Sequence, residues 1–183
     1  MLRGKNVNLR TVRRADLPKL LELRSEIRAR GQYFPLNLPT EISMQKSFEE
    51  DGMWGKQDGT MLVVDAVTDR IIGSVSYFNA QHYYDATKEI GYILYDPTDR
   101  GKGYGTEAVN LFVDYLFDWL NLARIQIQAE VDNVGSRKLA EKCGFVQEAI
   151  LKHVFWAGGA PQDIVVYAKL RGKPGLRGFP SSD

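Results

Sequence analysis

The fold is decided by the stretch Lys88-Glu-Ile-Gly-Tyr-Ile-Leu-Tyr-Asp-Pro-Thr-Asp-Arg-Gly-Lys-Gly-Tyr-Gly-Thr-Glu107. Residues 89–95 are rich in β-branched and aromatic side chains and stop before Pro97, which predicts a strand. Over residues 106–118 the apolar side chains recur with the period of a helix. The stretch therefore predicts a strand, a glycine-rich turn and a helix in succession.

The turn carries glycines at positions 101, 103 and 105, which let the backbone bend sharply and approach a ligand closely. A turn of this kind before a helix points unpaired N–H groups and the positive end of the helix dipole at one place. Arg100 and Lys102 add positive charge there. The turn therefore predicts a site for a phosphate-bearing ligand, with a plain tight turn as the alternative.

Two common nucleotide-binding motifs do not fit these glycines. The dinucleotide fingerprint requires Gly-x-Gly-x-x-Gly, whereas this run is Gly-x-Gly-x-Gly, and Gly-Lys-Gly lacks the Ser or Thr of a Walker loop.

The composition is that of an ordinary soluble globular protein. The chain has 183 residues, 24 Lys and Arg against 23 Asp and Glu, and a formal charge of +1, so no global field recruits nucleic acid or an anionic membrane. Its single cysteine excludes an intramolecular disulfide and a cysteine-based zinc cluster, and no apolar run has the length of a signal peptide or membrane span. We therefore expect a cytoplasmic protein with one domain over residues 1–170, a flexible tail over 171–183 and no metal site.

The remaining pattern predicts an α+β fold with a mixed, mostly antiparallel sheet of about seven strands and helices on both faces. The strand after the long helix, residues 125–131, must run parallel to residues 89–95, because the helix returns the chain to the same end of the sheet. The other predicted strands are 7–12, 60–67, 71–78, 149–156 and 164–170, and the other helices begin at Asp16, Glu41 and Val134.

The pattern Arg100-x-x-Gly103-x-Gly105 between a strand and a long helix resembles the pyrophosphate-binding motif of the GNAT superfamily of N-acetyltransferases. Asn133-x-x-Ser136 and Leu139-Ala-Glu-Lys-Cys-Gly-Phe145 resemble the helix and Gly-Phe turn that follow in that family. The run Asp163-Ile-Val-Val-Tyr-Ala168 resembles the final hairpin of the branch that contains ribosomal-protein N-terminal acetyltransferases. The likeness covers about residues 6–170, nearly the whole chain.

The resemblance implies that acetyl-CoA is the acyl donor and that its pantetheine arm lies between the two parallel strands, where they splay apart. Backbone N–H groups near residues 93–95 would be free to bind the pantetheine and the thioester carbonyl. The implied contacts to acetyl-CoA come from Ile93, Leu94, Tyr95, Arg100, Gly101, Lys102, Gly103, Tyr104, Gly105, Thr106 and Asn133.

Acetyl transfer to an amine requires a base that removes a proton from nitrogen and a donor for the departing thiolate. Glu89 is the predicted base; the alternatives are an ordered water, or a structural Glu89 paired with Lys88. Many family members place a tyrosine donor where this chain has Ala140, so Ser136 is the predicted donor, with helix capping as its alternative role.

The predicted acceptor site is aromatic and poor in carboxylates, which indicates an uncharged or partly apolar amine: a peptide N-terminus or a small molecule. Its predicted residues are Tyr33, Phe34, Tyr77, His82, Tyr83 and Tyr84.

Two other functions stay open, a non-catalytic acyl-CoA-binding module and a transferase of a larger acyl group such as succinyl. The sequence leaves the oligomeric state open, and a homodimer is compatible with it.

Overall fold

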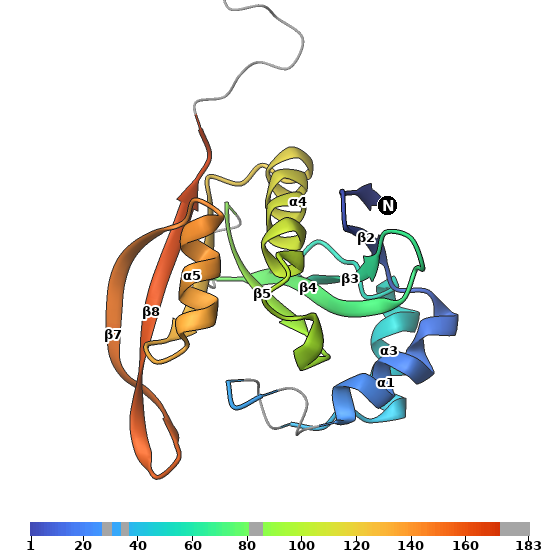
Figure 1. Cartoon of the computed structure of the whole chain (residues 1–183), viewed down its shortest axis with the longest axis horizontal. Helices are drawn as coiled ribbons and strands as arrows, with labels where there is room; N and C mark the ends of the chain where they lie inside the picture. Colours follow the sequence, from blue (N-terminus) through green and yellow to red (C-terminus); the bar gives the residue numbers. More distant parts are fainter. Residues whose placement is uncertain (27–30, 34–36, 81–85, 173–183) are drawn as a thin grey trace, which may run out of the picture.

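The protein is an α+β fold built on one eight-stranded sheet with the order β1-β2-β3-β4-β5-β6-β8-β7 (Figure 1). The structure, a computed structural model, describes residues 1–26, 31–33, 37–80 and 86–172. Among these, no helix is long and apolar enough to cross a bilayer. The strands are β1 (Leu2–Arg3), β2 (Val7–Thr11), β3 (Gly59–Asp65), β4 (Ile71–Asn79), β5 (Thr87–Leu94), β6 (Arg124–Glu130), β7 (Val146–Ala157) and β8 (Ala160–Leu170). The α-helices are α1 (Leu17–Ser25), α3 (Glu41–Asp51), α4 (Tyr104–Trp119) and α5 (Val134–Lys142).

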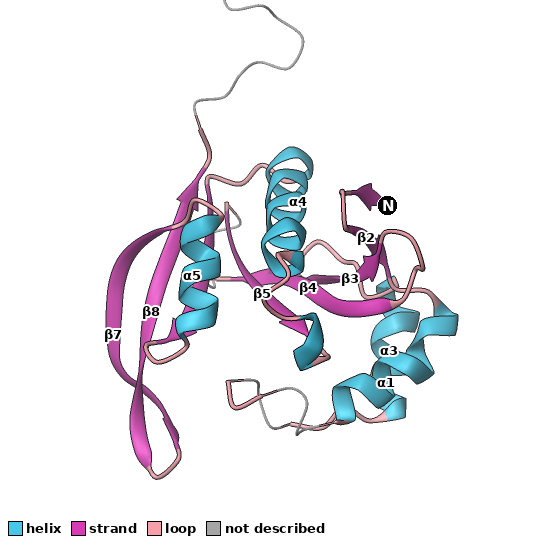
Figure 2. Cartoon of the chain, in the orientation of Figure 1, coloured by secondary structure: helices cyan, strands magenta, loops and turns pink. Residues whose placement is uncertain are grey.

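The helices divide between the two faces of the sheet, as the sequence predicted. One face packs under α4 and α5, where Val109, Phe112 and Leu116 are fully buried. The other face packs against α1 and α3 through Leu20 and Met44, at the β2–β3 end of the sheet (Figure 2).

The predicted parallel pair is β5 and β6, and it is paired over three residues only. The register runs from Thr87 opposite Arg124 to Glu89 opposite Gln126. Beyond that point β5 continues beside β4 to Leu94, whereas β6 continues beside β8 to Glu130. Each strand follows its own antiparallel partner, so the two separate into a V whose apex lies at Glu89.

Several elements extend beyond their predicted ends. Helix α4 begins at Tyr104, and the final hairpin is longer on both strands, since β7 begins at Val146 and β8 at Ala160. The additional strand is β1, two residues that pair with β2. Arg171, which we expected to begin the tail, is held to the α4–β6 connection by hydrogen bonds to the carbonyls of Leu122 (2.6 Å), Leu120 (2.8 Å) and Phe117.

Candidate active site

The glycine-rich turn forms the predicted anion site at the start of α4. Gly101 and Gly103 have φ angles of +76° and +86°, and no atom lies within 4 Å of a Cβ built at either position. Gly103 is the N-cap, and the first intrahelical bond runs from the Glu107 N–H to the Gly103 carbonyl at 3.0 Å. The N–H groups of residues 104–106 precede that bond, so they have no acceptor within the helix and face open space.

A cleft of about 820 Å³ opens from this turn into the V between β5 and β6. It brings together ten of the predicted site residues, namely Tyr33, Ile93, Leu94, Arg100, Gly101, Gly103, Gly105, Thr106, Asn133 and Ser136. At Gly105 a Cβ would lie 2.9 Å from Leu139 Cδ1, so the absence of a side chain lets α4 approach α5 closely.

Of the two cations that the motif predicted, Arg100 and Lys102, only Arg100 lines the cleft. Its Nη2 lies 3.4 Å from the Leu94 carbonyl. Lys102 instead lies 3.8 Å from the buried carboxylate of Asp99. Sequence reasoning missed Lys138 and Lys142 on α5, which also line the cleft. Their spacing of four residues, which puts both on one helical face, was the available signal.

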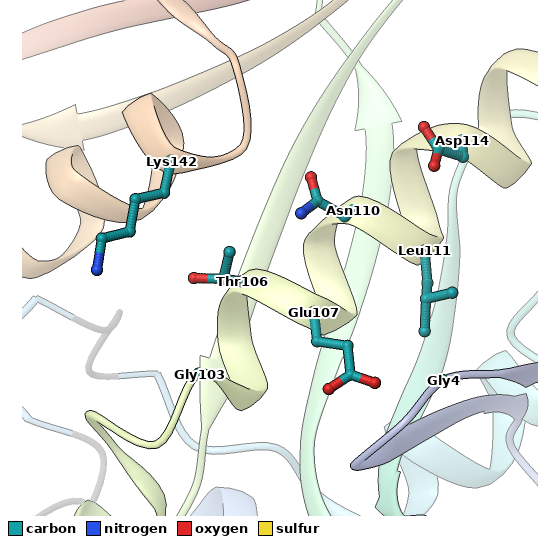
Figure 3. Close-up of a pocket in the computed structure, with 8 residues that line it drawn as sticks. All are labelled: Gly4, Gly103, Thr106, Glu107, Asn110, Leu111, Asp114 and Lys142. Atoms are coloured by element: carbon teal, nitrogen blue, oxygen red, sulfur yellow. The ribbon is translucent and has the colours of Figure 1, made fainter.

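A second hollow, of about 530 Å³, runs along α4 from the same turn (Figure 3). It shares Gly103, Thr106 and Lys142 with the cleft. On its floor Glu107 accepts hydrogen bonds from the backbone of Lys5 and from Asn6 (2.9 and 2.8 Å). Burial raises the pKa of Glu107, but these hydrogen bonds outweigh it and hold the pKa below its usual value. Glu107 thus ties the N-terminal strands to the helix that forms the anion site.

Only some of the backbone N–H groups near the end of β5 are free to bind a ligand. The Tyr95 N–H donates to the Ile72 carbonyl at 3.0 Å, so the expectation that this group is unpaired was wrong. Strand β4 stays paired with β5 up to Leu94, further than the sequence indicated. Since N–H groups in an antiparallel pair alternate in direction, those of Tyr92 and Leu94 point away from β4, into the V.

Glu89 lies at the apex of the V and is held by two amide side chains. Its Oε2 accepts a hydrogen bond from Gln126 Nε2 and another from Gln128 Nε2, each at 2.8 Å. Burial raises the pKa of Glu89, while the two amides partly oppose that shift. Lys88 is buried on the opposite face, where Nζ bonds the Lys56 carbonyl at 3.2 Å, so the alternative of a Lys88–Glu89 pair does not hold.

The capping role that the sequence left as the alternative for Ser136 belongs to Asn133, and the donor role of Ser136 stays a prediction. Asn133 is the N-cap of α5, and its Oδ1 accepts from the Ser136 N–H at 3.0 Å, which confirms the capping role of Asn133. The Ser136 hydroxyl lines the cleft and lies 2.7 Å from the hydroxyl of Tyr92 on β5. Sequence reasoning missed Tyr92, because its partner is 44 residues away in the chain.

The predicted acceptor residues separate in the structure. Tyr77 is a core residue: its side chain is fully buried, its ring packs edge-on against Trp54 at 5.2 Å, and its hydroxyl bonds the Gly55 carbonyl. Its assignment to the acceptor site was wrong. Tyr33 spans the cleft, donating to the Asp132 carbonyl at 2.9 Å. The other four, Phe34, His82, Tyr83 and Tyr84, lie outside the described residues.

Phe78, the neighbour of Tyr77, lies on the opposite face of β4. It is 40% exposed, it stands opposite Glu89 in the register, and a Cβ at Gly91 would lie 3.7 Å from its ring. Phe78, Glu89, Gln126 and Gln128 therefore share one face of the sheet, the face that α4 does not cover. We call these four residues the Glu89 face.

Comparisons with known proteins agree with this geometry. The family model described as "Acetyltransferase (GNAT) domain" matches residues 6–146. A probable N-acetyltransferase of Bacillus subtilis, YjcK, is 34% identical over an alignment of 181 positions that covers 93% of this chain and 97% of that protein. The ribosomal-protein-serine acetyltransferase of Escherichia coli is 27% identical over 75% of each chain. The crystal structure of spermidine N-acetyltransferase from Vibrio cholerae, in complex with CoA and spermine, superposes with a TM-score of 0.77 at 25% identity, over 90% of this chain and 95% of that one.

Proposed function

This chain belongs to the GNAT acetyltransferase family, and we propose that it transfers the acetyl group of acetyl-CoA to a primary amine on an uncharged or partly apolar carrier, a peptide N-terminus or a small molecule. The observation that carries the proposal is the V between β5 and β6: the cleft that opens from the α4 anion site enters this V, and Glu89 lies at its apex. The donor and the acceptor meet at that apex from opposite faces of the sheet.

The residues of the cleft fit acetyl-CoA as the acyl donor. The N–H groups at the start of α4 and the side chain of Arg100 suit the pyrophosphate, and Lys138 and Lys142 supply further positive charge. The N–H groups of Tyr92 and Leu94 are available to the pantetheine amides and the thioester carbonyl. A backbone N–H aimed at that carbonyl stabilises the negative charge that develops on its oxygen when the amine attacks.

Glu89 is the proposed base. Burial raises its pKa, which brings the carboxylate closer to the operating pH and strengthens it as a proton acceptor. Gln126 and Gln128 both bond Oε2, so they fix the orientation of the carboxylate. Glu89 takes the proton of the incoming ammonium, either directly or through one water. The Ser136 hydroxyl is the proposed hydrogen donor to the sulfur as the C–S bond breaks.

The Glu89 face favours an acceptor with little positive charge beyond the reacting amine. Over β4, β5 and β6, all of which the structure describes, the carboxylates are Glu89 and Glu130 alone. The aromatic ring of Phe78 and the side-chain amides of Gln126 and Gln128 surround Glu89. Recognition of a polyamine calls for several carboxylates, one for each ammonium group. Among the relatives, one is named for spermidine and another for a ribosomal protein; the Glu89 face supports a peptide amine more than a polyamine.

An amine panel with acetyl-CoA tests the proposal, with release of free thiol as the readout. The panel contains short peptides with free N-termini, apolar small amines and spermidine. Turnover with peptides or apolar amines is the expected result. A strong preference for spermidine would refute the proposed acceptor class while leaving the transferase activity intact. Binding of acetyl-CoA without turnover of any amine would favour a non-catalytic module, and faster turnover with succinyl-CoA would reassign the acyl group.

Phe78→Ala is expected to raise the KM for the acceptor about tenfold, equivalent to about 1.4 kcal/mol, because it removes the exposed aromatic surface opposite Glu89. The KM for acetyl-CoA should change less than twofold. Val67→Ala is the control, since Val67 is 93% exposed in the turn between β3 and β4. An unchanged acceptor KM in Phe78→Ala would show that the amine does not bind on this face.

A further inference from the structure

A partly buried tyrosine and a serine share a hydrogen bond inside the cleft. Tyr92 Oη lies 2.7 Å from Ser136 Oγ and 3.2 Å from the Ser136 carbonyl oxygen. Tyr92 is on β5, within the segment that has left β6, and Ser136 is in the first turn of α5. The hydrogen bond between them therefore connects β5 with α5, and both residues line the cleft.

Both members of the pair are held in place by the fold. The Ser136 N–H is bound by the Asn133 cap at 3.0 Å, which fixes the first turn of α5. The ring of Tyr92 packs against the core formed under α4 and α5. A serine hydroxyl has one hydrogen to give, and it can point toward either Tyr92 or the cleft. The direction of that hydrogen depends on which oxygen of the pair is the donor.

We propose that Tyr92 is a positioning residue for acetyl transfer: its hydroxyl donates to Ser136 Oγ, and this directs the Ser136 hydrogen into the cleft, toward the sulfur of the departing thiolate. The inference rests on the proposed function.

The step balances without a further reactant. The C–S bond of the tetrahedral adduct breaks, its electron pair goes to sulfur, and the Ser136 hydroxyl donates a hydrogen bond to the thiolate as the charge develops. The acceptor nitrogen loses two protons through Glu89 to solvent, one before it attacks and one from the tetrahedral adduct. The thiolate takes one proton from solvent to give CoA as the free thiol, so each turnover releases one proton. Burial raises the pKa of Tyr92 to about 12, against the opposing effect of its bond to Ser136, so Tyr92 keeps its proton and stays a donor.

Tyr92→Phe tests the inference, because it removes the hydroxyl and keeps the ring. We expect kcat to fall about fivefold to tenfold, the effect of losing one oriented hydrogen bond, with the KM for acetyl-CoA within twofold of wild type. Ser136→Ala should give a similar loss. The double variant should lose no more than the larger single loss, because the two hydroxyls act as one unit.

Two comparisons separate this role from a structural one. With the selenium analogue of acetyl-CoA, whose selenolate is a weaker base and needs less stabilisation, the defect of Tyr92→Phe should shrink to less than twofold. Tyr167→Phe is the matched control: Tyr167 is fully buried and, like Tyr92, bonds α5, through Glu141 at 3.0 Å, but it does not line the cleft. Its kcat should stay within twofold of wild type.

Three results would overturn the inference: a wild-type kcat in Tyr92→Phe, losses that multiply in the double variant, or an equal defect with the selenium analogue. In each of these the wild-type protein still turns over, so only the role of Tyr92 fails. Absence of thiol release by the wild-type protein with every amine of the panel would overturn the proposed function and this inference together.

Discussion

Replacing Glu89 by glutamine is expected to lower kcat about a hundredfold, the usual contribution of a positioned general base. The substitution keeps the shape of the side chain and one oxygen that can accept from Gln126 or Gln128. It removes the ability to accept a proton from the amine. The KM for acetyl-CoA should change little, because Glu89 lies at the apex of the V and does not line the cleft where the donor is proposed to bind. Initial rates of thiol release over a range of acetyl-CoA concentrations, at a saturating concentration of the acceptor, give both numbers.

The pH dependence of kcat/KM distinguishes a lost base from a damaged site. Because burial raises the pKa of Glu89, the acidic limb of the wild-type profile should lie above the ordinary range for a glutamate, with activity lost as the pH falls through it. Glu89→Gln should abolish this limb. Gln128→Leu removes one of the two hydrogen bonds that oppose the shift, so it should move the limb to higher pH.

Thermal stability provides the control for Glu89→Gln. A carboxyl group whose pKa is raised by folding favours the folded state at low pH, and this contribution is lost as the pH rises through the folded pKa. Above the folded pKa the ionised Glu89 therefore disfavours folding, and there glutamine should leave the melting temperature unchanged or raise it. A variant that keeps the acidic limb and wild-type kcat would show that water or another group is the base.

The local pattern predicted those parts of the site that lie close together in the sequence. The strand, the turn with Gly101 and Gly103, and the start of α4 occupy one continuous stretch, and each has its own signal in periodicity or residue type. The parallel direction of β6 followed from the long helix that precedes it. The splay also followed from family resemblance, and the register explains it by the separate antiparallel partners of β5 and β6.

The error at Tyr77 has a simple physical cause. Neighbouring residues of a strand point to opposite faces, so the choice between Tyr77 and Phe78 depends on the phase of the alternation. Along β4 the polar Ser74 and Ser76 alternate with Val75 and Tyr77, which places Tyr77 on the face of the buried Val75 and Phe78 on the other face. This alternation was the available signal, and the assignment of Tyr77 to the acceptor site overlooked it. Trp54, Phe112 and Trp119 surround Tyr77 on the α4 face.

The supporting residues of the site escaped prediction because their partners are remote in the chain. Gln126 and Gln128 reach Glu89 across 37 and 39 residues, and Tyr92 reaches Ser136 across 44. No local period encodes such contacts, since they depend on the parallel register of β5 and β6 and on where α5 docks. The same holds for the Tyr95 N–H, whose acceptor Ile72 lies beyond the predicted end of strand pairing.

Gly103→Val is expected to weaken the affinity for CoA at least tenfold, about 1.4 kcal/mol, in isothermal titration calorimetry. The φ angle of +86° at Gly103 is strongly disfavoured for a β-branched residue, and relief of that strain must turn the N–H groups at the start of α4 away from their common direction. The added side chain would also occupy the open space that the phosphates need.

Gly159→Val is the matched control, because Gly159 has a φ of +79° and equally open surroundings in the β7–β8 turn, away from the cleft. It carries the same backbone strain, so a loss of stability alone would appear in both variants. Affinity lost in Gly103→Val and kept in Gly159→Val would support phosphate binding by the turn, whereas unchanged affinity in Gly103→Val would exclude the turn as the anion site.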